Sequence, residues 1–419
     1  MPPRSLELTA RAPLIVNPRW AKSEQAAPAV DSPPADAWAD RPLRVLLLTD
    51  ADVFAGTEQH ILSLALGLRA HGLHASIACP VPGALATRAQ AASVPIVPVQ
   101  KEGLIDWRAV HTLKALLRTG QFDIIHAHNG RTSLSAALAV RLAHVGHCVI
   151  TQHFLEPGRL GRSGARAMLS WMAHRWVGRR AHHFIAISDA VRREMLARND
   201  AAPSKITVVP NGVPDAAATV LRPPDDVRRD LGIDPQVPLI VCAARLQPEK
   251  DIASLVSAMS MLRGRYPDAV CAIAGEGVEH DALRSQIERS GLSQTVRLLG
   301  FRRDVLDIIN AADMLVLPSL AEPFGLVLLE AMALSKPIIA TAAGGPLEIV
   351  ADNQTGLLVP PAAPLAICDA IASLLADPPL ALRMGKLGRK RFLERFTVER
   401  MALATTRIYR QITYAARRT

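Results

Sequence analysis

Aromatic residues and long apolar runs are scarce in this sequence. Phe, Trp and Tyr together make up 4% of its 419 residues, which argues against surfaces that stack nucleic-acid bases. No run of about 18 uncharged apolar residues is present, so the sequence predicts no transmembrane helix. The formal net charge of +10 therefore points to anionic small ligands or to an anionic membrane surface, and we expect no nucleic-acid partner.

Cysteines are also few, and none has a partner at a meaningful spacing. The five are Cys79, Cys148, Cys242, Cys271 and Cys368, and no two of them have the spacing of a metal or redox motif. Four lie in apolar, strand-like runs such as "SIACP" and "LIVCAA", where cysteine acts as a small apolar residue. This usage predicts a reducing compartment, and we expect the protein in the cytoplasm.

The first 41 residues lack the continuous apolar segment of a secretory signal and are rich in Ala and Pro. Such a composition does not bury enough apolar surface to fold. We expect residues 1–41 to form a disordered leader.

Short apolar runs alternate with helical segments along the rest of the chain, which predicts parallel strands buried on both faces. The first series is "LRVLLLTD", "HASIACP", "PIVPV", "FDIIHAH", "HCVITQ", "HFIAIS" and "KITVVP"; the second is "PLIVCAA", "AVCAIAG", "TVRLLG", "DMLVLP", "PIIAT" and "TGLLVP". A Pro- and Asp-rich segment, residues 211–238, separates them. We expect two doubly wound α/β domains, 42–211 and 212–396, with ligands beyond the carboxyl ends of the strands.

Two cations follow the first strand of the second series in "AARLQPEKD". Arg245 and Lys250 lie on one rim of the expected sheet, where they suit a diphosphate, because Arg can grip two oxygens at once. A surface pairing with Glu249 and Asp251 is an equally good explanation of these two residues alone. Gly275, in "AGEGVEH", lies where backbone can approach a ligand.

Two glutamates bracket an apolar run in "LAEPFGLVLLEAM". A helix beginning near Gly325 would leave Glu322 before it and Glu330 in its second turn, and carboxylates are rarely buried without partners. Free N–H groups at the start of that helix favour an anion. Each glutamate could form a structural salt bridge, or both could accept hydrogen bonds from a hydroxylated ligand.

In combination these segments resemble the retaining glycosyltransferases of family 4. The resemblance rests on "VVPNGV", "ARLQPEKD", "AGEGVEHDAL", the E-x7-E element and the "GGPLEIV" segment after it, and it runs in order from about residue 42 to 410. It implies the GT-B fold, in which two Rossmann-like domains face a cleft that holds a nucleotide-sugar. It also implies that a final helix, residues 397–419, crosses back to the first domain, which helix periodicity alone does not decide.

The resemblance assigns roles on the donor side. Arg245 and Lys250 match the cations that hold the donor diphosphate, Glu330 matches the glutamate that binds ribose, and Glu322 matches the glutamate that faces the transferred sugar. The remaining donor-side positions are Gly56, Gly275, Gly300, Phe301, Arg302, Phe324, Gly325 and Leu326. Gly300 to Arg302 would flank the base, and no cofactor is expected beyond the donor itself.

The first domain is expected to hold the acceptor. "FAGTEQH" resembles the family's Gly-Gly loop, with Ala55 in place of the first glycine and Gly56 as the second. His153, in "TQHF", matches the active-site histidine near the transferred sugar. Thr57, His128 and Asn129 are the predicted acceptor contacts.

Two metal motifs have better explanations. Asp50-Ala51-Asp52 spells D-x-D, but it ends the first strand of a fold that needs no metal, so loop capping explains it better. His126 and His128 could share a metal, yet no third ligand has suitable spacing. We therefore expect no metal.

The resemblance implies a retaining transfer without an enzyme nucleophile, in which the acceptor attacks on the face that the leaving phosphate vacates. A glycan or lipid-linked acceptor in cell-surface polysaccharide or lipopolysaccharide synthesis is expected. Two alternatives stay open: a nucleotide-sugar epimerase on the same fold, and a non-catalytic nucleotide-sugar-binding protein.

The segment "GRLGRSGARAMLSWMAHRWVGRRAHH" predicts a helix with apolar and basic sides. Met168, Leu169, Met172 and Trp176 share one side, and Arg162, Arg166, Arg179 and Arg180 lie nearby. This pattern is typical of peripheral contact with anionic lipid, here the inner face of the plasma membrane. A helix packed on its own domain is the alternative.

Overall fold

The computed structural model describes residues 42–51, 54–99, 106–155, 165–219 and 221–418. The predicted leader, residues 1–41, lies outside these ranges, as do Asp52 and Arg162.

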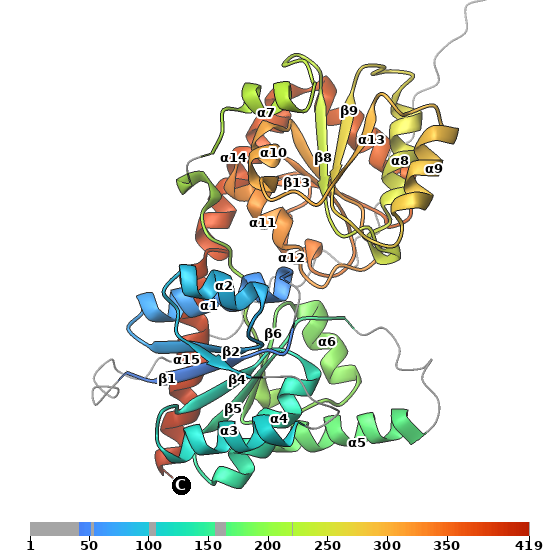
Figure 1. The fold of residues 1–419 in the computed structure, drawn as a ribbon. Helices are drawn as coiled ribbons and strands as arrows, with labels where there is room; N and C mark the ends of the chain where they lie inside the picture. The colour runs from blue at the N-terminus through green and yellow to red at the C-terminus, as the bar shows by residue number, and fades with distance from the viewer. Residues whose placement is uncertain (1–41, 52–53, 100–105, 156–164, 220, 419) are drawn as a thin grey trace, which may run out of the picture. The chain divides into compact units, whose positions relative to one another are not determined.

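The first sheet has seven parallel strands in the order β3-β2-β1-β4-β5-β6-β7 (Figure 1). Its strands are Arg44–Leu48 (β1), His74–Cys79 (β2), Ile96–Pro98 (β3), Ile124–Ala127 (β4), His147–Gln152 (β5), His183–Ala186 (β6) and Ile206–Val208 (β7). Its helices are Gly56–Ala70 (α1), Ala84–Ala91 (α2), Trp107–Arg118 (α3), Gly130–Ala143 (α4), Ala165–Arg180 (α5) and Asp189–Ala197 (α6).

The second sheet has six parallel strands in the order β10-β9-β8-β11-β12-β13. Its strands are Leu239–Ala243 (β8), Val270–Ala274 (β9), Val296–Gly300 (β10), Met314–Leu317 (β11), Ile338–Thr341 (β12) and Gly356–Val359 (β13). Its helices are Pro224–Asp230 (α7), Ile252–Leu262 (α8), His280–Arg289 (α9), Val305–Ala311 (α10), Leu326–Ala333 (α11), Pro346–Ile349 (α12), Pro364–Ala376 (α13) and Pro378–Arg395 (α14).

Each of the thirteen predicted apolar runs forms a strand, in two parallel sheets, as the sequence predicted. Burial on both faces explains why the runs are apolar throughout. In β1, Val45 and Leu47 belong to one core cluster, whereas Leu46 and Leu48 belong to another on the opposite face. The order of strands reverses between β1 and β4 and between β8 and β11, the two places where the carboxyl ends of doubly wound sheets bind ligands.

The last helix, Val398–Arg418 (α15), packs against α1 of the first domain. Its close approach requires Gly67, because a Cβ there would lie 2.7 Å from the Cβ of Ala402 and 2.8 Å from Val398. Farther along, the fully buried Tyr409 places its hydroxyl 2.6 Å from Nδ1 of His126, on β4. The final helix is therefore part of the core around the first sheet.

The five cysteines are free and buried. Within the described ranges, no single helix is both long and apolar enough to cross a membrane; α13 and α14 pass such a test only when joined, and they meet at a bend of 102°.

Candidate active site

The loop between β11 and α11 carries Glu322 and is held by the glycines after β12. Gly325 has a φ of +103°, a conformation that residues with a Cβ rarely adopt, and the helix starts at the next residue. The loop bonds to the "GGP" segment: the Gly345 amide donates to the Glu322 carbonyl over 2.8 Å. A Cβ on Gly344 or Gly345 would collide with the backbone of this loop. These glycines therefore fix the place of Glu322.

Glu322 and Lys250 form an ion pair that joins two of the predicted catalytic residues. Nζ of Lys250 lies 2.6 Å from Oε2 of Glu322, and the side chains are 13% and 9% exposed. The hydroxyl of Ser319 donates to the same carboxylate oxygen over 3.1 Å. Oε1 of Glu322 has no hydrogen-bond partner in the described part of the chain, so one face of the carboxylate is available to a ligand.

Arg245 is bound to a different glutamate, Glu249. Its guanidinium donates to Glu249 over 3.1 Å, and both side chains are largely exposed, at 62% and 45%. This is the surface pairing that the sequence left open for Arg245. Lys250 pairs with Glu322 and not with Asp251, the surface partner considered from the sequence. Exposed pairs contribute only about 0–1 kcal/mol. An anionic ligand can therefore draw Arg245 away at little cost.

Glu330 lies in the second turn of α11, as predicted, and is half-buried. Its carboxyl group accepts no hydrogen bond from the described residues. Burial raises its pKa to about 7. A ligand whose hydroxyl groups donate hydrogen bonds would therefore stabilise this partly buried carboxylate.

Three predicted donor-side positions have structural explanations within the protein. Gly275, at φ +149°, lies against the carbonyl of Ala244, so a Cβ there would clash with the neighbouring loop. The Phe301 amide donates to Glu276 over 3.4 Å, while its ring is 61% exposed. Arg302 is held by Asp304 through two hydrogen bonds of 2.8 and 2.6 Å. An exposed ring beside a fixed guanidinium still leaves a surface on which a base can stack.

The first turn of α1 lies beside the first turn of α11. A Cβ on Gly56 would be 3.4 Å from Cδ1 of Leu326. Ala55 has an extended backbone that any residue can adopt, at φ −136° and ψ −162°, so alanine fits where the family has glycine. The Ala55 amide donates to the carboxylate of the buried Glu58 over 3.0 Å, which fixes the loop entering α1.

Two further predicted positions lie at these same two helix starts. Thr57 is in the first turn of α1 and is half-buried. Phe324 is 2% exposed and its ring packs against Phe396, so only its backbone can meet a donor.

Two contacts that the sequence did not predict tie the β11–α11 loop and α12 to the first domain. The hydroxyl of Ser188, at the start of α6, donates to the Pro323 carbonyl over 2.9 Å. The carboxylate of Glu348, from the "GGPLEIV" segment, accepts from the Asp189 amide over 2.8 Å. A carboxylate is favoured at a helix start, but no spacing rule connects residues that are about 160 positions apart in the chain.

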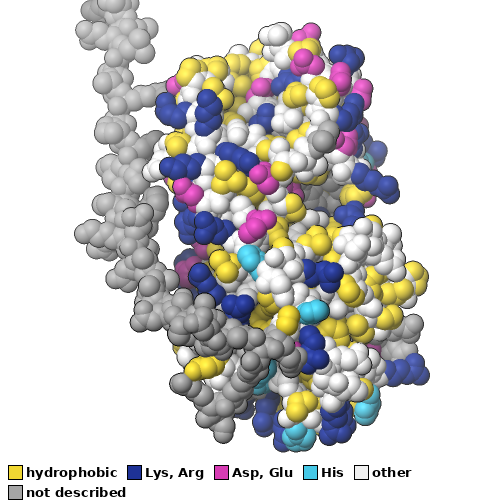
Figure 2. All heavy atoms as spheres, turned by 90° about the vertical axis from the view of Figure 1, so that its left-hand side faces the viewer, with side chains coloured by type: hydrophobic (Ala, Val, Ile, Leu, Met, Phe, Trp, Pro, Cys, Tyr) yellow, Lys and Arg dark blue, Asp and Glu magenta, His cyan; other side chains and the backbone are white. Residues whose placement is uncertain are grey.

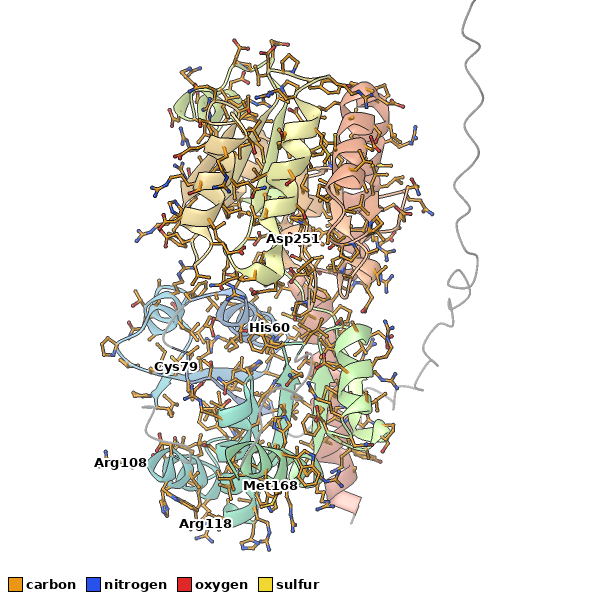
Figure 3. All side chains as sticks on the ribbon, turned by 90° about the vertical axis from the view of Figure 1, so that its right-hand side faces the viewer. His60, Cys79, Arg108, Arg118, Met168 and Asp251 are labelled. Atoms are coloured by element: carbon orange, nitrogen blue, oxygen red, sulfur yellow. The ribbon has the colours of Figure 1, made fainter. Side chains whose placement is uncertain are left out.

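Four histidines gather at the carboxyl ends of β4 and β5. His128 and His153, both predicted, are buried, with Nδ1 of one 3.1 Å from Nε2 of the other. His60, from α1, was not predicted to be part of the site; its ring centre lies 4.7 Å from that of His153 (His60 is labelled in Figure 3). His126 has both ring nitrogens bonded, to Tyr409 and to Thr151.

The fold brings together a histidine set other than the His126–His128 pair considered from the sequence. His60, His128 and His153 place ligand atoms within 4.8 Å of one another. Spacing in the sequence did not reveal the set because its members come from three separate elements. His126, one of the two histidines considered from the sequence, is not among them.

Asp50 and Asn129 have partners within the protein. The Asn129 amide donates to Asp50 over 2.5 Å, and its oxygen accepts from the Thr132 amide, which caps α4. Asp50 also pairs with Arg131 at 2.9 Å. The amide nitrogen and the amide oxygen of Asn129 are thus both hydrogen-bonded within the protein. The Asp50 carboxylate binds Asn129 and Arg131 and so stabilises the loop after β1.

The chain matches two families along its length. Residues 224–391 match the family described as Glycosyl transferases group 1, and residues 54–217 match Glycosyltransferase Family 4. The alpha-maltose-1-phosphate synthase of Mycobacterium tuberculosis (strain ATCC 25618 / H37Rv) is 31% identical over 401 residues, which cover 88% of this chain and 100% of that protein.

Two solved structures share the fold. A glycosyltransferase from Rickettsia africae ESF-5 has a TM-score of 0.78 at 20% identity, over 89% of this chain and 99% of that one. Anabaena Alr3699/HepE in complex with UDP has a TM-score of 0.76 at 22% identity, over 88% and 100%. The predicted GT-B fold of two Rossmann-like domains is confirmed.

Proposed function

The chain belongs to glycosyltransferase family 4, and from this we propose that it moves a sugar from a nucleoside-diphosphate sugar to an acceptor with retention of configuration, without a metal. The observation that carries the proposal is the Lys250–Glu322 pair. It places a cation beside a carboxylate whose Oε1 has no partner in the described part of the chain, at the carboxyl ends of the strands and before the start of α11.

In this mechanism the cations stabilise the leaving group. Negative charge builds on the β-phosphate as the glycosidic bond breaks, and preorganised charges are often the largest catalytic term. Lys250 is held in place by Glu322, and Arg245 exchanges its exposed partner Glu249 for the diphosphate. The leaving phosphate then helps to take the proton of the attacking acceptor.

The two glutamates orient the donor. Oε1 of Glu322 accepts from a hydroxyl of the transferred sugar, and Glu330 accepts from the ribose. His153 lies at the end of β5, where it contacts the sugar from the side of the first domain. We propose a uridine nucleotide as the donor's leaving group, supported by the UDP bound to Anabaena Alr3699/HepE.

Transfer by EDTA-treated protein tests this function. The expected result is that nucleoside diphosphate is released from one nucleotide-sugar, and only when an acceptor is present. NMR should show that the anomeric configuration of the product is the same as that of the donor. EDTA should leave the rate within about twofold, because Lys250 and Arg245 replace the metal. Sugar isomerisation without acceptor would identify an epimerase, and binding without turnover a non-catalytic protein. Restoration of lost activity by Mg²⁺ would overturn metal independence.

We also propose that α5 contacts anionic lipid, which fits a lipid-linked acceptor, a place on the inner face of the plasma membrane and a role in cell-surface polysaccharide or lipopolysaccharide synthesis. Met168, Leu169, Trp171 and Met172 are 63%, 49%, 48% and 50% exposed, and Figure 3 shows Met168 at the surface. Trp176, which helical spacing grouped with these residues, packs partly against the core.

Charge supports the same surface. Arg175 lies over the ring of Trp171 at 5.1 Å, and Arg179 and Arg180 at the end of α5 are exposed. Residues 42–211 hold more Lys and Arg than Asp and Glu, whereas residues 212–396 do not. Figure 2 draws the side of the molecule away from the right-hand end of α5 in Figure 1, and there too Asp and Glu side chains are few over the elements of the first sheet. Positive charge beside exposed apolar side chains favours the surface of an anionic bilayer.

Flotation at low salt tests the membrane surface. Wild-type protein should float with anionic vesicles and less with neutral ones. Replacing Met168 and Met172 by Gln should lower binding at least about tenfold, because each side chain loses about 1.5–3 kcal/mol of apolar transfer energy. The matched control replaces Leu382 and Leu393, which are exposed on α14, by Gln and should leave flotation unchanged. Equal recovery with both kinds of vesicle would rule the surface out.

A further inference from the structure

Three buried imidazoles from three different elements converge beside the first sheet. His60 comes from α1, His128 follows β4 and His153 follows β5. Their exposed fractions are 4%, 0% and 6%. One ligand atom from each lies within 4.8 Å of the others. The set is fixed by the fold, because β4 and β5 are neighbours in the sheet.

Three ring nitrogens of this cluster lack partners among the described residues. Both ring nitrogens of His60 and Nε2 of His128 are buried and form no hydrogen bond there. A buried polar group left unpaired costs about 1–3 kcal/mol. Asn211, whose side-chain oxygen is also unpaired, lies near His60 but outside hydrogen-bond geometry. Such a concentration of unpaired nitrogen suits a ligand that accepts nitrogen lone pairs.

The imidazoles have the protonation state that metal ions require. Burial lowers the pKa of His60 to about 4, with Asn211 partly offsetting it. Burial also lowers the pKa of His128 and of His153 well below the usual value. Neutral rings keep a lone pair for a metal ion, so ligation at neutral pH displaces no proton from an imidazolium.

We propose that His60, His128 and His153 form a binding site for a divalent first-row transition-metal ion, such as Zn²⁺. Three imidazoles select this class over Mg²⁺ or Ca²⁺, which prefer oxygen ligands. A tetrahedral ion with Zn–N bonds of 2.0–2.1 Å needs ligand nitrogens about 3.3 Å apart. Side-chain rotation has to bring the ligand nitrogens, now within 4.8 Å of one another, closer together. An ion bound to Nδ1 of His128 or Nε2 of His153 replaces the hydrogen bond between these two atoms.

The site shares His153 with the proposed active site, but the ion takes no part in the proposed transfer. Lys250 and Glu322 come from the second domain, and the proposed reaction needs no metal. An ion at this site would occupy His153, so metal binding would inhibit sugar transfer. This consequence rests on the proposed function, whereas the binding itself does not.

Titration of tag-free, metal-free wild-type protein with Co²⁺ tests the site directly. The expected result is one equivalent bound, with the intense visible bands of a four-coordinate ion, and its displacement by Zn²⁺. The His60→Gln variant should lose more than the roughly 100-fold in affinity that loss of an outer-shell group costs. The matched control is His111→Gln, on the exposed side of α3, which should bind as the wild type does.

Circular dichroism shows whether His60→Gln is folded; His153→Gln, from a different element, serves as the second ligand variant and should show the same loss. Equal Co²⁺ affinity in the wild type and in both variants would place the ion elsewhere. Octahedral spectra, or no bound ion at all, would overturn the proposal.

Discussion

Glu322→Gln should lower kcat by two to three powers of ten, roughly 3–4 kcal/mol. The transferred sugar gains positive character as its bond to the phosphate breaks, and the half-free carboxylate of Glu322 faces it in the proposed mechanism. The substitution keeps the shape but removes the charge, so the loss falls on the transition state. The donor KM should change little, because an amide still accepts a hydroxyl hydrogen bond.

A purely structural Glu322 would behave differently. Glu322 and Lys250 are nearly buried, and removing one member of such a pair destabilises proteins by about 3–5 kcal/mol. Thermal unfolding of the variant should therefore be measured beside steady-state kinetics at saturating donor. Glu394→Gln, on the exposed side of α14, is the matched control. A variant with lowered Tm but normal kcat would leave Glu322 only the structural role.

The strands could be predicted because each is read from a few adjacent residues. A strand buried on both faces is apolar along its whole length, and turn residues mark its ends. The start of α11 was predicted at Gly325 for the same reason. The two-domain fold then followed from the number and order of these local segments.

Contacts between distant residues could not be predicted from such patterns. Lys250 and Glu322 are 72 positions apart, and either could have paired with a nearer charge, as Arg245 does. His60 looks like any polar residue of an amphipathic helix until α1, β4 and β5 are placed together. The resemblance to a family predicted which two cations and which two glutamates belong to the site. It did not predict the ion pairs and hydrogen bonds that these residues form.

Glu330→Gln should weaken donor binding and stabilise the ligand-free protein at the same time. Its carboxyl is half-buried without a partner among the described residues, and burial raises its pKa to about 7 from an ordinary 4.5. Below pH 4.5 the group is protonated in both the folded and unfolded states and has no effect on stability. Between pH 4.5 and 7 the unfolded state ionises the group while the folded state keeps it protonated, so this group makes the wild type less stable at pH 8 than at pH 4.

The amide of the variant does not titrate, so that cost disappears. We expect the variant to exceed the wild type in unfolding free energy by roughly 1–2 kcal/mol at pH 8 and to match it at pH 4. The donor KM should rise roughly tenfold at pH 8, because hydrogen bonds to a charged acceptor are worth about 1.5–3 kcal/mol and the ribose does not react. Thermal unfolding at both pH values, with and without nucleoside diphosphate, measures both effects. A variant less stable than the wild type at pH 8, or one whose sole defect is kcat, would show that the Glu330 carboxylate has a partner other than ribose.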